Sequence, residues 1–134
     1  MTGISRRALF WAPRALSIAF ILFISLFALD AFSEGRGFWG ALLAFGIHLV
    51  PSLVLLSALV VAWRWEWVGA GFYAVIGALY ILFVVPRAIP SATKAVWILT
   101  VAGPAFVIAA LFLMNWLKRS ELRPPEPERH PGKP

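Results

Sequence analysis

The stretch AWRWEWVGAG, at residues 62–71, lies between two long apolar runs and decides how the chain folds. Tryptophan favours the headgroup level of a bilayer, because its ring combines an apolar body with a polar N–H. Arg64 can extend toward lipid phosphates. Glu66 can accept a hydrogen bond from a neighbour, or lie at a helix N-terminus, where the dipole favours an anion. We therefore expect an interfacial turn between two membrane helices. The turn residues are Trp63, Arg64, Trp65, Glu66 and Trp67.

A catalytic pair formed by Arg64 and Glu66 is the alternative interpretation, but no nucleophile or metal ligand lies near them in the sequence. The chain has no cysteine, which excludes disulfides, thiolate metal sites and thiol nucleophiles. Phosphate-binding loops and catalytic triads are also missing. We predict no catalytic residue, no cofactor and no metal site, and we place an enzyme third among the possible classes of function.

The composition points to a membrane. The chain has 134 residues, enough for one domain, and 61% of them are hydrophobic while 13% are charged. A soluble domain has about 25% charged residues. The formal charge of +6 does not indicate nucleic-acid binding, because the basic residues cluster at the ends of apolar segments, where anionic headgroups lie. The expected surroundings are the lipid bilayer.

Four apolar runs are long enough to cross the hydrocarbon core, which takes about 20 residues of helix. Backbone groups in lipid must be satisfied internally, so we predict helices, and hence an all-α bundle of four transmembrane helices. The expected spans are 15–32, 38–63, 68–85 and 95–117. A basic N-terminus (1–14) precedes them. A proline-rich tail (118–134) follows, and it is predicted to be disordered because it has nothing to bury.

Lysine and arginine predict the orientation, because cytoplasmic segments carry an excess of both. Nine lie in the N-terminus, the second connection and the C-terminal end, against three in the first and third connections. The prediction is a multi-pass protein of the inner (cytoplasmic) membrane with both termini inside. The sequence AFS at 31–33 loosely fits a cleavage site for an export signal, but the apolar stretch before it is long for a signal core. We therefore expect an uncleaved first helix.

Several short stretches, taken together, resemble a family of small four-helix prokaryotic membrane proteins that is a domain of unknown function. They are ALDAFSEG, GFWGALLAFGIHLVP, AWRWEWVG, GALYILF and AGPAF, and the resemblance covers most of residues 5–118. It implies an integral membrane protein with four helices, and it implies no activity.

His48 is the first candidate for a functional site, because it is expected near mid-membrane, where ionisable residues are costly and often functional. Pro51 follows on the same helix face and frees the Ile47 carbonyl. A small polar pocket there could relay a proton or hold a quinone headgroup. The alternative is a neutral imidazole that bonds to a neighbouring helix and fixes the packing.

Asp30 and Glu34 are the second candidate, at the outer end of the first span. They could form an entrance for a cation or substrate. The interpretation that we favour is an ion-pair ring with Arg36, Arg87 and Lys94, since these charges share that face.

Small residues of the third span predict a packing face, because they let helices approach closely. They include Ala70, Ala74 and Ala78, with Gly69, Gly71 and Gly77 nearby. The face could be internal or could join a homo-oligomer or another membrane protein. For function we expect a structural or accessory membrane component, and as the alternative a small-molecule carrier or a lipid- or quinone-binding protein built around His48 and Pro51.

Overall fold

The computed structural model describes residues 3–32 and 37–118. Four long helices account for nearly all of this part of the chain. Their bounds are α1 (Gly3–Leu26), which continues into the 3-10 helix η1 (Phe27–Phe32), α2 (Gly37–Arg64), α3 (Glu66–Val84) and α4 (Ser91–Leu117). All four are long and apolar enough to cross a membrane. The predicted all-α fold with four membrane helices is confirmed. The tail predicted to be disordered lies, from residue 119 on, outside the described residues.

All four helices begin before the apolar runs that predict them. α1 begins at Gly3 rather than at residue 15, so its basic residues belong to the helix itself. α2 spans 28 residues, about 42 Å, which exceeds a hydrocarbon core of about 30 Å and favours a tilted helix. Hydropathy marks where lipid begins, whereas backbone hydrogen bonding continues the helix into the headgroup region.

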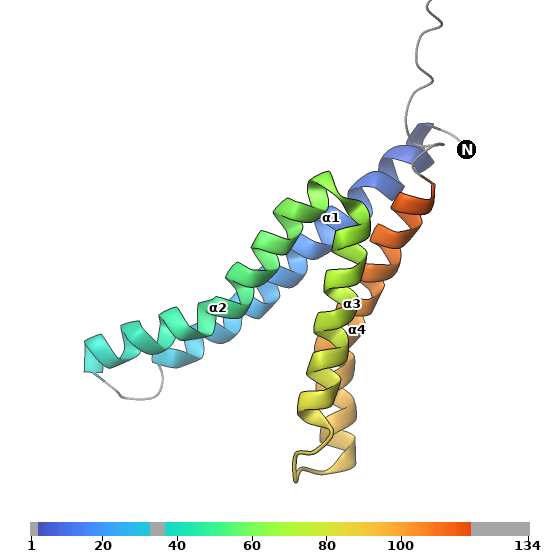
Figure 1. The fold of residues 1–134 in the computed structure, drawn as a ribbon. Coiled ribbons are helices and arrows are strands. Elements are labelled where there is room, and N and C mark those ends of the chain that lie inside the picture. Colours follow the sequence, from blue (N-terminus) through green and yellow to red (C-terminus); the bar gives the residue numbers. More distant parts are fainter. Residues whose placement is uncertain (1–2, 33–36, 119–134) are drawn as a thin grey trace, which may run out of the picture.

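The four helices form two antiparallel hairpins, α1–α2 and α3–α4, which meet at one end and diverge toward the other (Figure 1). The end where they meet contains the connection between α2 and α3, the start of α1 and the end of α4. α3 and α4 share the most extensive helix contact. The start of α1 and the end of α4 therefore lie at the same end of the molecule.

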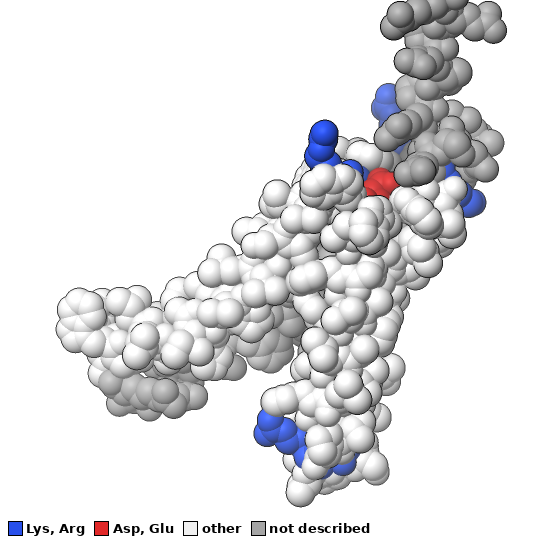
Figure 2. All heavy atoms as spheres, viewed as in Figure 1, with Lys and Arg blue, Asp and Glu red and all other residues white. Residues whose placement is uncertain are grey.

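The core lies where the two hairpins meet. Side chains from all four helices form it, and Tyr73 of α3 stacks on Phe112 of α4 with ring centroids 6.1 Å apart. Outside the core, large apolar side chains are exposed along every helix. On the face shown in Figure 2, lysine and arginine lie where the hairpins meet and at the far tip of the α3–α4 hairpin, and the described surface between these two places is uncharged. This distribution suits a protein whose middle faces hydrocarbon.

The sequence predicts a single packing face for the small residues of α3, but only some of these residues are buried. Gly69, Ala70 and Gly77 are buried, whereas Gly71 and Ala78 are exposed. A Cβ atom on Gly69 would lie 2.5 Å from the Cβ of Ala62 in α2. The close approach thus depends on Gly69, next to the turn, because α2 and α3 are separated there by Trp65 alone.

Candidate functional site

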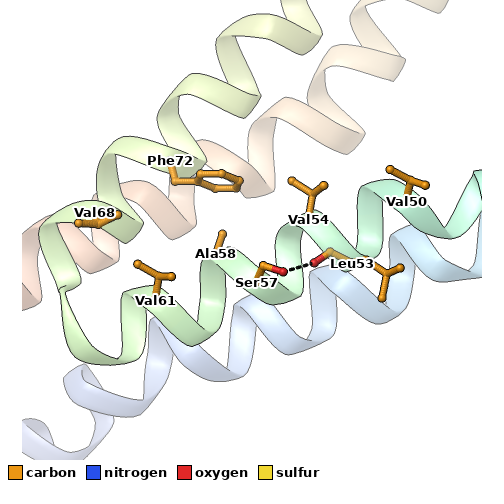
Figure 3. Close-up of a pocket in the computed structure, with 8 residues that line it drawn as sticks. All are labelled: Val50, Leu53, Val54, Ser57, Ala58, Val61, Val68 and Phe72. Carbon is orange, nitrogen blue, oxygen red and sulfur yellow. Dashed lines mark hydrogen bonds between the residues drawn. The ribbon is translucent and has the colours of Figure 1, made fainter.

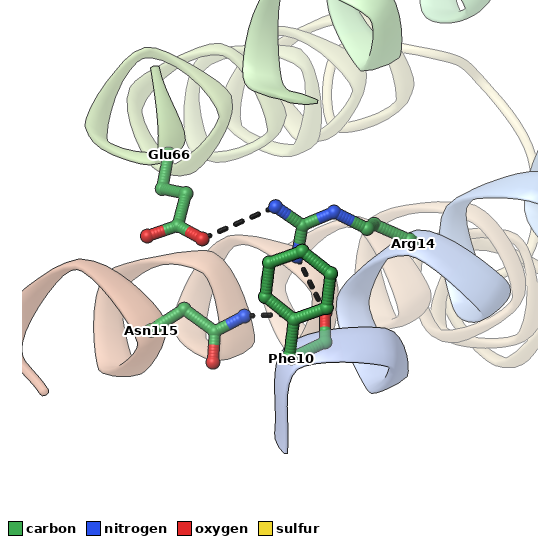
Figure 4. A network of polar contacts seen from close by, with 4 residues as sticks. All are labelled: Phe10, Arg14, Glu66 and Asn115. Atoms are coloured by element: carbon green, nitrogen blue, oxygen red, sulfur yellow. Dashed lines mark hydrogen bonds and ion pairs between the residues drawn. The ribbon is translucent and has the colours of Figure 1, made fainter. Parts of the chain in front are cut away.

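Arg14 is the most deeply buried charged side chain among the described residues, with 1% of its surface exposed. Its Nη2 lies 3.1 Å from Oε1 of Glu66, which is itself 17% exposed, and its Nη1 donates to the Phe10 carbonyl. Its guanidinium carbon lies 3.7 Å from the centroid of the Phe10 ring. Figure 4 shows this arrangement, in which α1 reaches Glu66 at the start of α3.

Asn115 of α4 joins the same group and is fully buried. Its Nδ2 donates to the Phe10 carbonyl over 3.5 Å, a long bond between α4 and α1 (Figure 4). Within the described part of the chain, Nε of Arg14 and Oδ1 of Asn115 have no hydrogen-bond partner. We call Phe10, Arg14, Glu66 and Asn115 the buried polar cluster. It ties α1 to both helices of the second hairpin at the end where the hairpins meet.

The buried polar cluster contains no nucleophile, and its two charges neutralise each other. Its chemistry is therefore that of a fixed ion pair. From the sequence, Glu66 is expected to accept a hydrogen bond from a neighbour, as it does from Arg14. The sequence does not single out Arg14 as the donor, because Arg14 looks like one more basic residue of a cytoplasmic N-terminus. One signal was present: Arg14 lies among apolar residues, and Glu66 is the only acidic residue between residues 35 and 120.

The structure places the five predicted turn residues around a very short connection. α2 ends at Arg64, Trp65 has extended backbone (φ −128°, ψ 90°), and α3 begins at Glu66. Glu66 turns inward to Arg14, while the other four side chains are exposed. Arg64 and Glu66 thus do not form a pair with each other. The exposed residues are Trp63, Arg64, Trp65 and Trp67.

His48 is exposed and lines a groove between the two hairpins. Its Nδ1 lies 2.8 Å from the carbonyl oxygen of Ala44 in the same helix. The packing interpretation expected a hydrogen bond to a neighbouring helix, which this contact does not provide. Pro51 and Ile47 line the same groove, which also includes Tyr80 of α3. We call this space the hairpin groove. Its volume is about 610 Å³, and no charged residue lines it among those described.

A second groove lies between α2 and α3, closer to the turn (Figure 3). It has a volume of about 460 Å³ and shares Val50 and Val54 with the hairpin groove. Its one hydroxyl, Ser57 Oγ, donates to the Leu53 carbonyl over 2.9 Å. This α2–α3 groove therefore offers a ligand little besides apolar contact, whereas the hairpin groove includes His48 and Tyr80.

The second predicted candidate, Asp30 and Glu34, lies largely outside the described residues. The backbone of Asp30 belongs to η1, but its side chain and the whole of Glu34 lie outside the described residues, as does Arg36. Lys94 Nζ donates to the Val85 carbonyl over 2.7 Å, and the guanidinium of Arg87 lies 4.0 Å from the Phe83 ring centroid. Because the hairpins diverge, the α3–α4 connection is remote from η1 and the start of α2 (Figure 1).

Histidine and acidic side chains do not gather into a metal site in the described ranges, 3–32 and 37–118. Together, four apolar helices and the uncharged surface between the charged groups of Figure 2 define a multi-pass membrane protein. Within this class, residues 1–123 match the family model DUF7670, a domain of unknown function, and the chain belongs to that family. Comparisons with curated proteins and with solved structures gave no match.

Proposed function

We propose that this protein is a non-enzymatic component of the cytoplasmic membrane that holds an apolar, lipid-like molecule in the hairpin groove. The observation that carries the proposal is the groove itself, an apolar space of about 610 Å³ whose lining includes His48 and Tyr80. Sites for small molecules have volumes of about 300–1,000 Å³ and combine apolar walls with a few polar groups.

The position of the hairpin groove supports a ligand from the bilayer. Helix rise places His48 about 24 Å from the end of α2 at Arg64, and Tyr80 about 21 Å from the start of α3 at Glu66. The two polar side chains thus lie at similar depths on diverging helices. Water at such a depth would face almost entirely apolar side chains, whereas a lipid-like molecule fills the same space favourably.

Filling the groove tests the proposal. Val54 is exposed and lines the groove, whereas Val60 lies on the same helix, is also exposed, and lines none of the described grooves. We expect native mass spectrometry of the gently released protein to show a bound apolar molecule in the wild type and in Val60→Trp. Val54→Trp should lose most of it, because the indole occupies the space.

Equal retention in Val54→Trp and Val60→Trp would contradict the assignment of the groove. A bare protein in all three samples would favour the second candidate, a structural or accessory role beside a partner or a second copy. That role is supported by the many large apolar side chains that are exposed along the helices.

The proposed orientation, with both termini in the cytoplasm, has its own test. The chain lacks cysteine, so single cysteines can be introduced without a background. Trp65 and Arg87 are exposed and lie in connections at opposite ends of α3. A membrane-impermeant maleimide should label Arg87→Cys in intact cells and Trp65→Cys only after the cytoplasmic face is opened. The reverse pattern would show the opposite orientation.

A further inference from the structure

The hydrogen bond of His48 fixes which ring nitrogen carries a proton. Nδ1 lies 2.8 Å from the Ala44 carbonyl, and a carbonyl oxygen has no proton to give. Nδ1–H must therefore be the donor. In the neutral ring, Nε2 then has a lone pair and acts only as an acceptor. No described residue donates a hydrogen bond to it.

Tyr80 supplies a complementary group to the same groove. Tyr80 lines this groove, and its hydroxyl takes part in none of the hydrogen bonds between described residues, so it can both donate and accept. A ligand hydroxyl has both a proton that Nε2 of His48 can accept and an oxygen that can accept from Tyr80. A ketone or ether oxygen can accept from Tyr80, but it has nothing to donate to His48.

From this chemistry we infer that the hairpin groove selects a hydroxyl-bearing apolar molecule, such as a long-chain alcohol or the reduced form of a quinone, over its ether or carbonyl counterpart. The inference rests on the proposed function, because it specifies the ligand class of the same groove. His48 is then the residue that determines specificity, and the apolar walls supply most of the affinity without discriminating between such ligands.

The test compares two matched probes, hexadecanol with a mid-chain diazirine and its methyl ether, on the full chain in phosphatidylcholine vesicles. Photolabelled residues are mapped by mass spectrometry. We expect the alcohol to label the groove about fivefold more than the ether, the preference that one hydrogen bond gives. His48→Leu should label equally with both probes. Val50→Leu, an apolar change in the same groove, should keep the preference.

The outcomes separate the two proposals. If both probes label the groove equally in the wild type, or if His48→Leu keeps the preference, the inference is overturned while the groove stands as a binding site. If neither probe labels the groove in the wild type, the proposed function itself fails. Tyr80→Phe provides a second check, because it should weaken labelling by both probes and leave a preference for the alcohol.

Discussion

Replacing Glu66 with leucine should lower the free energy of unfolding by about 3–5 kcal/mol, the usual cost of removing one partner of a buried ion pair. The substitution leaves the guanidinium of Arg14 buried, with 1% of its surface exposed and no counter-charge. The Phe10 carbonyl and ring remain as partners, but they are neutral. Unfolding in mixed micelles, followed by tryptophan fluorescence, measures the change.

Three further variants make this result specific. Arg64→Met removes an exposed charge from the same turn and should change the stability by less than about 0.5 kcal/mol. Glu66→Gln keeps an acceptor for Nη2 and should cost less than Glu66→Leu. The double variant Arg14→Met/Glu66→Leu should recover most of the loss, because it removes both charges of the pair. A loss in Glu66→Leu no larger than that in Arg64→Met would contradict the role of the ion pair.

Gly69→Ala should destabilise the protein by about 1–3 kcal/mol, the cost of overpacking a core. The new Cβ would lie 2.5 Å from the Cβ of Ala62 and 3.3 Å from the Phe112 ring. The Cβ of Ala62 is attached directly to the backbone, so only a shift of α2 relative to α3 relieves the clash. With Trp65 as the sole residue between the two helices, there is little room for that shift. The same unfolding measurement applies.

Two other glycines of α3 serve as controls. A Cβ on Gly71 meets nothing within 4 Å, so Gly71→Ala should be neutral or stabilising by up to about 1 kcal/mol through helix propensity. A Cβ on Gly77 would lie 3.0 Å from the end of the Phe106 ring, and this side chain is 40% exposed and can rotate away. Gly77→Ala should therefore fall between the other two variants. Equal stability of Gly69→Ala and Gly71→Ala would show that α2 can shift relative to α3 and relieve the clash.

Much of the fold can be predicted from local properties of the chain. Apolar length predicts four helices, and the tryptophan-rich stretch at 62–71 predicts the position of the turn between α2 and α3. Helix bounds are less well predicted, as the start of α1 at Gly3 shows, because backbone hydrogen bonding does not end where the apolar run ends. The absence of cysteine, and the thiol chemistry that it excludes, follow from the sequence alone.

The candidate sites depend on how the helices meet. Arg14 and Glu66 lie 52 residues apart, and nothing in their neighbourhoods says which faces of α1 and α3 come together. The two hairpins diverge (Figure 1), and the hairpin groove lies between them. His48 of α2 lines it together with Tyr80 of α3 and Val101 of α4.

Hydropathy thus determined that this chain belongs in a membrane and where its helices lie, since the transfer of a side chain into lipid is a local property. Only the tertiary structure decided that one arginine is buried and one histidine lines a groove. In lipid, helix association depends on packing and on hydrogen bonds between helices, and both are properties of two helices at once.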